Sequence, residues 1–208
     1  MTHTMGLIIF GFGGHSRAVA DVALACGIEK LLFIDSNARD GEHFMGHPVL
    51  RDLPSSNEEN WACMPASGDS LKRQSQIEEI ESLGWSVATL IAPSATIGIG
   101  TTISKGCIVG QHAHIGPMAT VGKGCIINTA AVVEHESKVG DFVHISVNAT
   151  VAGRSTIGEF SFIGAGAIVI DGINICNNVT VGAGSVVIKN INDSGVYIGT
   201  PACLVKKR

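Results

Sequence analysis

The chain has 208 residues, 45% of them hydrophobic and 15% charged, with a formal net charge of −4. This balance indicates a compact globular protein of one or two domains and excludes a long disordered tract. The Lys and Arg residues are scattered, so no basic stripe for nucleic acid is predicted, and the apolar runs are short and broken by Gly, so no membrane span is predicted.

The first part of the chain predicts a strand, a helix and a second strand. The sequence begins without the positively charged segment and small-residue cleavage site of a secretory signal, so a cytoplasmic location is expected. Residues 6–10 are a short aliphatic run, and residues 31–34 are another, which ends at Asp35. Between them, small and apolar residues recur at helical spacing until Gly27, namely Ala18, Val19, Val22, Ala23 and Cys26.

The glycine-rich turn at residues 11–16 is a weak signal for nucleotide binding. It places backbone N–H groups and a helix N-terminus where phosphate oxygens would be stabilised. Ser16 stands where a dinucleotide fingerprint has its third Gly, and the domain is too short for a complete dinucleotide fold. One nucleotide with its phosphates is therefore favoured over NAD, and a tight connection without a ligand is the plainer alternative.

The rest of the first domain predicts a third strand and a second helix. After a polar loop at residues 55–60, residues 61–65 are predicted to form a strand. Asp69 or Ser70 is predicted to cap a helix, which carries Leu71, Ile77, Ile80 and Leu83. Residues 87–91 lead into the next region. The sequence thus predicts an α/β domain at residues 1–90, a half-Rossmann unit of βαβαβ order.

From Ile91 to Val187, every sixth residue is Ile or Val, in seventeen of seventeen positions. A fixed six-residue period predicts a parallel β-helix, in which each hexad forms one side of a triangular coil and buries its aliphatic residue. With three hexads per coil, the chain returns to the same side after 18 residues, one strand spacing of ~4.8 Å away. The coil is predicted at residues 91–192, followed by a C-terminal tail at residues 193–208.

Two other positions of the hexad are restricted, if the aliphatic residue is counted as the first. Gly occupies the second position in eight hexads, which predicts corners with positive φ. The fifth position is usually small, which predicts a tightly closed prism. Cys107 and Cys125 share that position and are predicted to stack as reduced core residues; the six cysteines form no CxxC pair or short zinc-type spacing, so no metal is expected.

Polar residues interrupt the pattern at one place. Asn128 and Glu134 replace the second-position Gly in consecutive hexads, and His135 and Glu136 follow. His135 is in the third position, which is predicted to face outward, and Gly153 is predicted to lie directly above it, 18 residues later. A base beside an unshielded backbone N–H is the pairing that acyl transfer needs. His144 lies half a coil further along the chain, so His144 and His135 should meet only between two subunits.

Several stretches together resemble the hexapeptide-repeat acetyltransferases of the PglD and NeuD type, and they cover nearly the whole chain. The stretches are GFGGHSRAV (11–19), GDSLKR (68–73), NTAAVVEHESKVGDFVHIS (128–146), Ala152-Gly153 and VYIGTPA (196–202). The resemblance implies a left-handed β-helix and a homotrimer that holds acetyl-CoA between adjacent helices. One departure is Ala92-Pro93-Ser94, where many relatives have His-Pro-Ser.

The resemblance also implies roles for individual residues. His135 would be the general base, Glu136 its orienting carboxylate, and Gly153 the backbone donor to the thioester oxygen. The implied acetyl-CoA contacts are His144, Gly153, Ala165, Ala183 and Lys189. The implied contacts of the nucleotide sugar are Gly13, Gly14, His15, Asp35, Gly68, Asn128 and Glu134.

The activity that the resemblance implies is acetyl-CoA-dependent N-acetylation of a 4-amino-4,6-dideoxy sugar of the bacillosamine kind. The sugar would be linked to a nucleotide, with UDP as the expected one, and would serve surface-glycan or protein-glycan assembly. Neither a metal nor a nucleic-acid partner is expected.

Three alternatives remain open. A NeuD-like enzyme would O-acetylate sialic acid, and a non-catalytic scaffold would only bind the nucleotide sugar. A zinc hydratase of the γ-carbonic-anhydrase type is also built on a trimeric β-helix. Such hydratases share a His-x4-His pair, and no two histidines here are five positions apart. Metal content and the effect of His135→Ala would separate these alternatives.

Overall fold

The computed structural model describes residues 6–54 and 61–207, and the chain divides into two compact units between Ala92 and Pro93. The division lies two residues beyond the predicted domain boundary. The polar loop predicted at residues 55–60 lies outside the described residues.

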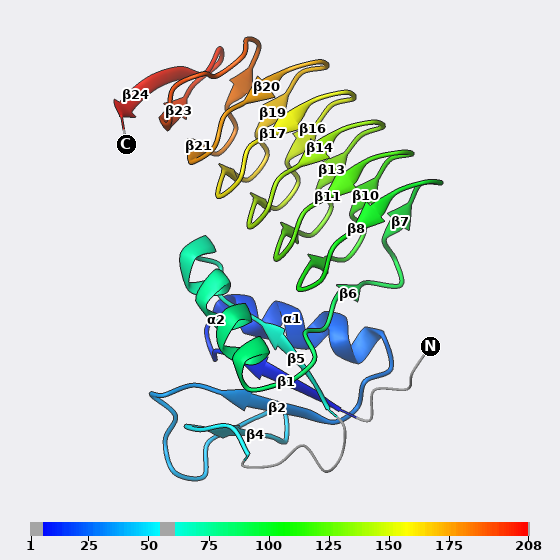
Figure 1. Cartoon of the computed structure of the whole chain (residues 1–208), viewed down its shortest axis with the longest axis vertical. Coiled ribbons are helices and arrows are strands. Elements are labelled where there is room, and N and C mark those ends of the chain that lie inside the picture. The colour runs from blue at the N-terminus through cyan, green and yellow to red at the C-terminus, as the bar shows by residue number, and fades with distance from the viewer. Residues whose placement is uncertain (1–5, 55–60, 208) are drawn as a thin grey trace. The chain divides into compact units, whose positions relative to one another are not determined.

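The first unit is a five-stranded sheet with the strand order β3-β4-β2-β1-β5 (Figure 1). β1 (Leu7–Phe10), β2 (Leu31–Ile34) and β5 (Ala62–Pro65) pair in parallel, as their predicted βαβ order requires. α1 (Gly14–Ala25) and α2 (Ser70–Ser82) are the two predicted helices. The carboxyl ends of the parallel strands and the N-termini of the two helices therefore lie at the same edge of the sheet, where the glycine turn is.

A hairpin that the sequence analysis did not predict extends this sheet. β3 (His43–Phe44) pairs antiparallel with β4 (His47–Leu50), which in turn pairs parallel with β2. Met45 and Gly46 form the turn, with φ of 50° and 82°, the backbone that a two-residue hairpin loop requires. The hairpin brings Phe44 against Phe33, with ring centroids 5.8 Å apart.

α2 has the predicted N-terminal cap, and it buries an arginine as well as apolar residues. The predicted cap is confirmed, since the Asp69 carboxylate accepts a hydrogen bond from the Lys72 N–H at 2.9 Å. Ile77 and Ile80 are buried, whereas Leu71 and Leu83 of the predicted apolar set are exposed. Arg73 is only 1% exposed, and its guanidinium donates to the carbonyl oxygens of the turn at residues 67–68, which compensates for the loss of water.

The second unit is a parallel β-helix with three sheets, as the hexads predict (Figure 1). Its pairs join residues that are eighteen positions apart: His114 pairs with Thr96 on one side and with Val132 on the other. Each corner is followed by a strand of two residues, occasionally more. In chain order the strands are β6 (Leu90–Ile91), β7 (Thr96–Ile97), β8 (Thr102–Ile103), β9 (Ile108–Val109), β10 (His114–Ile115), β11 (Thr120–Val121), β12 (Ile126–Ile127), β13 (Val132–Val133), β14 (Lys138–Val139), β15 (His144–Ile145), β16 (Thr150–Val151), β17 (Thr156–Ile157), β18 (Phe162–Ile163), β19 (Ile168–Val169), β20 (Asn174–Ile175), β21 (Val179–Val181) and β22 (Val186–Val187).

The first and fifth hexad positions build the core of the coil. From Val109 to Val187, every first-position residue is at most 3% exposed, whereas Ile97, at the start of the coil, is 40% exposed. Cys107 and Cys125 are fully buried free thiols, and the Cys125 N–H donates to the sulfur of Cys107 at 3.3 Å. The predicted stack of reduced cysteines is therefore confirmed.

The predicted C-terminal tail continues the β-helix. β23 (Gly195–Ile198) pairs parallel with β21, and β24 (Cys203–Lys207) pairs antiparallel with β23. The last strands thus lie in one of the three sheets of the coil and belong to the second unit.

The prediction of positive φ at the second-position glycines is wrong. Positive φ occurs at the fourth position of every hexad from Gly100 to Gly184, and non-glycine residues such as Glu136 (59°) and Arg154 (56°) adopt it too. The second-position glycines have another physical reason: backbone atoms of the next coil lie against seven of the eight, and the Ile198 side chain lies against Gly182. A Cβ on Gly158 would lie 2.5 Å from the backbone nitrogen of Asn177.

Gly158→Ala is therefore expected to destabilise the coil by about 1–3 kcal/mol, because backbone atoms of the next coil must move to admit the methyl group. Chemical denaturation monitored by circular dichroism measures this. Ser146→Ala is the matched control, since Ser146 occupies the same hexad position and already has a Cβ. Equal stability of the two variants would contradict the packing argument.

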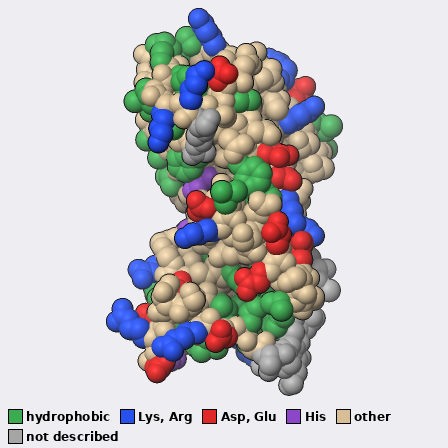
Figure 2. Space-filling model, turned by 60° about the vertical axis from the view of Figure 1, so that its left-hand side comes forward, with side chains coloured by type: hydrophobic (Ala, Val, Ile, Leu, Met, Phe, Trp, Pro, Cys, Tyr) green, Lys and Arg blue, Asp and Glu red, His purple; other side chains and the backbone are tan. Residues whose placement is uncertain are grey.

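One face of the molecule carries mixed charge. On the face that Figure 2 shows, described Lys and Arg side chains alternate with Asp and Glu rather than forming a basic stripe. Within residues 6–54 and 61–207, no helix has the length and apolar character needed to cross a bilayer.

Candidate functional site

His135 and Gly153 are neighbours on consecutive coils. His135 lies at the corner between β13 and β14, and its carbonyl oxygen accepts a hydrogen bond from the Arg154 N–H at 2.9 Å. A Cβ on Gly153 would lie 2.5 Å from Nε2 and 2.7 Å from Cε1 of His135, so the imidazole covers the glycine. The predicted adjacency is confirmed, and no larger residue could stand at position 153 without displacing the ring.

Glu136 holds the other side of the imidazole. Its Oε1 lies 3.3 Å from Nδ1 of His135, and the two side chains are 59% and 42% exposed. With Nδ1 donating to this carboxylate, Nε2 keeps its lone pair on the side of Gly153. Glu134 points elsewhere, because its Oε2 accepts a hydrogen bond from the His135 N–H at 3.2 Å.

Gly153 is buried, and within the described residues its N–H donates no hydrogen bond. A backbone N–H without a protein acceptor is available to water or to a ligand. The corner therefore presents a proton acceptor and a hydrogen-bond donor side by side.

The other residues predicted to contact the sugar or acetyl-CoA form separate groups. Asn128 and His144 contact each other, with Nδ2 and Nε2 3.2 Å apart, and His144 packs edge-on against Phe162. This contact was not predicted from the sequence. His144 lies on β15, in the sheet that contains β12 and β18, so it is on a different side of the prism from the corner of His135.

The remaining predicted acetyl-CoA residues lie in later coils. Ala165 and Ala183 are stacked one coil apart, and the Gly184 N–H donates to the Ala165 oxygen at 2.8 Å. Lys189 lines a cavity at the C-terminal end of the coil together with Tyr197 and Cys203.

In the first unit, Gly13 and Gly14 form the N-terminus of α1. Gly13 is the N-cap residue, it supplies no side-chain cap, and the first turn has no acidic residue. A Cβ on either glycine would meet no atom within 4 Å, so packing alone does not require them. Because Gly13 supplies no side-chain cap, the N–H groups of this helix end are suited to a phosphate.

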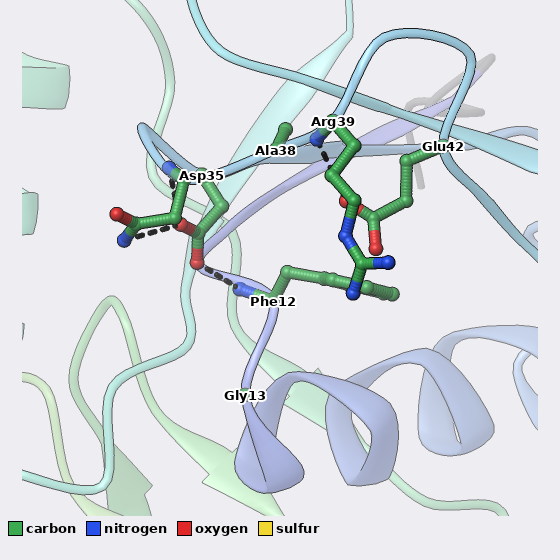
Figure 3. Close-up of a pocket in the computed structure, with 7 residues that line it drawn as sticks. Phe12, Gly13, Asp35, Ala38, Arg39 and Glu42 are labelled. Atoms are coloured by element: carbon green, nitrogen blue, oxygen red, sulfur yellow. Dashed lines mark hydrogen bonds between the residues drawn. The ribbon is translucent and has the colours of Figure 1, made fainter.

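Asp35 lies beside this helix end, at the end of β2. Its Oδ2 accepts a hydrogen bond from the Phe12 N–H and its Oδ1 one from the Asn37 N–H, both at 2.9 Å (Figure 3). These residues and Arg39 and Glu42 line a pocket of about 230 Å³. Phe12, Arg39 and Glu42 were not predicted as site residues. The available signal was the set of Phe12, Phe33 and Phe44, whose rings contact one another.

The comparisons with known proteins agree with this arrangement. Residues 6–80 match the family model described as PglD N-terminal domain. The acetyltransferase domain of PglB from Neisseria gonorrhoeae, solved alone and with acetyl coenzyme A, is 32% identical and superimposes with a TM-score of 0.91, covering 97% of this chain and 100% of that one. A comparison with curated protein sequences gives no match.

A second similar structure is a variant of GDP-perosamine N-acetyltransferase from Caulobacter crescentus in complex with CoA and GDP-perosamine. It is also 32% identical, with a TM-score of 0.89 over 97% of each chain. This chain belongs to the PglD-type hexapeptide-repeat acetyltransferases. The PglD-type acetyltransferase thus combines the α/β unit and the parallel β-helix predicted from its sequence.

His15 of this PglD-type acetyltransferase is uncharged at neutral pH. Burial and the neighbouring Arg73 guanidinium lower its pKa to about 4. The unfolded chain has an ordinary histidine pKa of ~6.5. Between pH ~4 and ~6.5, His15 is therefore protonated in the unfolded chain and neutral in the folded chain. His15 therefore favours folding above pH ~6.5, and this contribution is lost as the pH falls toward ~4.

Wild-type protein is expected to lose up to about 3 kcal/mol of unfolding free energy between pH 6.5 and 4 from this one group. His15→Gln should lose correspondingly less over the same range, because glutamine does not titrate. Urea unfolding at several pH values measures the difference. His43→Gln, which replaces an exposed histidine of the hairpin by the same residue, is the matched control for the substitution itself.

Gly68 belongs to the turn before α2 rather than to the Asp35 pocket, since its carbonyl oxygen accepts from Arg73 at 3.2 Å. The PglD-type acetyltransferase has no group of three or more His, Cys, Asp or Glu residues placed to hold a metal ion within the part of the chain that the structure describes.

Proposed function

We propose that the protein transfers the acetyl group of acetyl-CoA to the 4-amino group of a nucleotide-linked 4-amino-4,6-dideoxy sugar, with His135 as general base. The observation that carries the proposal is the corner where Nε2 of His135 faces Gly153, whose N–H donates no hydrogen bond within the described residues. The relatives support the substrates: one is solved with acetyl coenzyme A and another with CoA and GDP-perosamine.

The chemistry follows from this corner. The free amine attacks the thioester carbonyl carbon, and Nε2 of His135 accepts the proton that the amine loses. Glu136, hydrogen-bonded to Nδ1, keeps Nε2 unprotonated before the attack and stabilises the imidazolium after it. The Gly153 N–H donates to the oxyanion of the tetrahedral intermediate. Collapse breaks the C–S bond, and the imidazolium returns its proton to the departing thiolate of CoA.

The full site is proposed to form between subunits of a homotrimer. Within one chain, His144 and Asn128 lie on a different side of the prism from His135. A neighbouring subunit would bring its own His144 to the corner of His135 and Gly153, with Ala165, Ala183 and Lys189 along the acetyl-CoA path. The sugar would contact Glu134 and Asn128.

The first unit is proposed to bind the nucleotide. The N-terminus of α1, with Gly13, Gly14 and His15, would hold phosphate, and Asp35 would accept hydrogen bonds from the ribose or base. Gly68 would contribute through the turn before α2. UDP is the proposed nucleotide, and a cytoplasmic location, in which the six free cysteines stay reduced, completes the proposal.

An acceptor panel tests the proposal. Purified protein is incubated with acetyl-CoA and UDP-, dTDP- or GDP-linked 4-amino sugars or free sialic acid, and thiol release and the acetylated product are measured. Turnover of a nucleotide-linked amino sugar supports N-acetylation, with the UDP sugar preferred. Turnover of sialic acid alone would replace it with O-acetylation, and absence of thiol release with every acceptor would leave a binding scaffold.

Two further measurements separate the remaining alternatives. Direct transfer predicts intersecting initial-rate plots, whereas ping-pong kinetics with an acetylated protein would contradict the mechanism. Stoichiometric zinc in protein purified without chelator would favour the hydratase.

A further inference from the structure

Two of the three third-position Asp and Asn residues in the coil, Asp141 and Asn177, share a hydrogen-bonding pattern. A side-chain oxygen of each residue accepts a hydrogen bond from the backbone N–H of the third-position residue one coil earlier. Asp141 accepts a hydrogen bond from the Lys123 N–H at 2.7 Å, and Asn177 accepts one from the Glu159 N–H at 3.0 Å. In both cases the two residues are eighteen positions apart, so the coil geometry itself brings acceptor and donor together.

Asp171 is the remaining third-position Asp or Asn, and it departs from this pattern. Eighteen positions earlier is Gly153, whose N–H donates no hydrogen bond within the described residues. The carboxylate is nevertheless close, since its Oδ1 lies 3.1 Å from the place that a Cβ on Gly153 would occupy. Its Oδ2 instead accepts a hydrogen bond from Nη2 of Arg154.

We propose that Arg154 is a positioning residue that draws the Asp171 carboxylate away from the Gly153 N–H and so keeps this donor open for the thioester oxygen. The inference rests on the proposed function of Gly153. The pair is half exposed, with side chains 58% and 50% exposed, and such ion pairs add little to stability. Its effect here is to set the direction in which Asp171 points.

A capped donor would be a poor oxyanion donor. Asp171 is negatively charged, so a carboxylate on the Gly153 N–H would both occupy the hydrogen bond and repel the oxyanion. The hydrogen bond and charge of Asp171, and to a smaller extent the charge of Glu136, raise the pKa of Arg154, so the guanidinium stays charged beside the corner of His135 and Gly153.

Paired substitutions test the inference. Arg154→Gln is expected to lower kcat about 10- to 100-fold, because Asp171 is released to cap Gly153, and removal of one oxyanion donor costs about 10²–10³-fold elsewhere. Asp171→Ala alone should stay within about threefold of wild type, and the double variant should recover to the same range. Arg154→Gln combined with Asp141→Ala is the matched control and should not recover, since Asp141 caps Lys123.

The double variant decides between explanations. If Arg154→Gln remains slow after Asp171 is removed, Arg154 acts on the substrate or the oxyanion directly and the inference is wrong. Unchanged kcat in Arg154→Gln would also overturn it.

A measurement on the free protein keeps the inference separate from the proposed function. Hydrogen–deuterium exchange at the Gly153 amide should slow in Arg154→Gln and return to the wild-type rate in the double variant. If exchange follows this order while no acceptor is turned over, the positioning role stands and the proposed function fails. Exchange that is identical in wild type and Arg154→Gln contradicts the positioning role whatever the activity.

Discussion

His135→Ala is expected to lower kcat by about 10²–10⁴-fold while acetyl-CoA binding is retained, because the variant loses the base that accepts the proton of the attacking amine. Nε2 faces the Gly153 corner and Nδ1 is held by Glu136, so the substitution removes the proton acceptor from this place. Steady-state thiol release gives kcat, and titration calorimetry gives the affinity for acetyl-CoA.

His114→Ala is the matched control for this prediction. His114 lies on β10, one coil before His135, where its Nδ1 is 2.7 Å from the hydroxyl of Thr96, and it has no proposed part in the reaction. Its kcat should remain within about threefold of wild type. If His135→Ala also kept its turnover, His135 would be a surface residue and the general base would have to be sought elsewhere.

Gly153→Ala is expected to lower kcat about 10²-fold or more without unfolding the coil, since small displacements of a catalytic group have effects of that size. The new Cβ would lie 2.5 Å from Nε2 of His135, so the imidazole must move out of position. The close atoms belong to side chains, including the Asp171 carboxylate, and side chains can rotate where backbone cannot. Activity and the thermal melting curve are both measured.

Gly158→Ala provides the contrast. At Gly158 the obstructing atoms are backbone atoms of the next coil, so stability rather than chemistry should suffer. A Gly153→Ala protein that melts as early as Gly158→Ala would mean that Gly153 is a structural glycine. An intact Gly153→Ala protein with wild-type kcat would contradict the proposed geometry of the corner.

The sequence predicted those parts of the fold that depend on repetition. A period of six with three hexads per coil places position i+18 above position i, and this arithmetic alone put Gly153 over His135. The apolar runs of β1, β2 and β5 were found because each is bounded by glycine or polar residues. The residue roles came from the resemblance, and they stay predictions until the variants are measured.

The missed features depend on contacts that neither the repeat nor the hydrophobic pattern of the sequence encodes. The β3–β4 hairpin is too short to show a period, and its apolar contacts lie on Phe12 and Phe33. Arg73 is buried because carbonyl oxygens of its own turn receive its guanidinium, which no pattern of hydrophobicity reveals. The corner glycines were assigned to a dihedral requirement because sequence cannot show how near the next coil approaches.

The uninterrupted register of the coil limits how a gene for such a protein can change in length. One codon gained or lost between His135 and Gly153 would shift every later residue by one hexad position, so that Gly153 would no longer lie next to His135. Duplicating a whole coil elsewhere would leave that partnership intact. Tolerated length variation should therefore come as eighteen-residue blocks or as segments that bulge outward at a corner, and an alignment gap of any other size inside the coil would mark such a bulge.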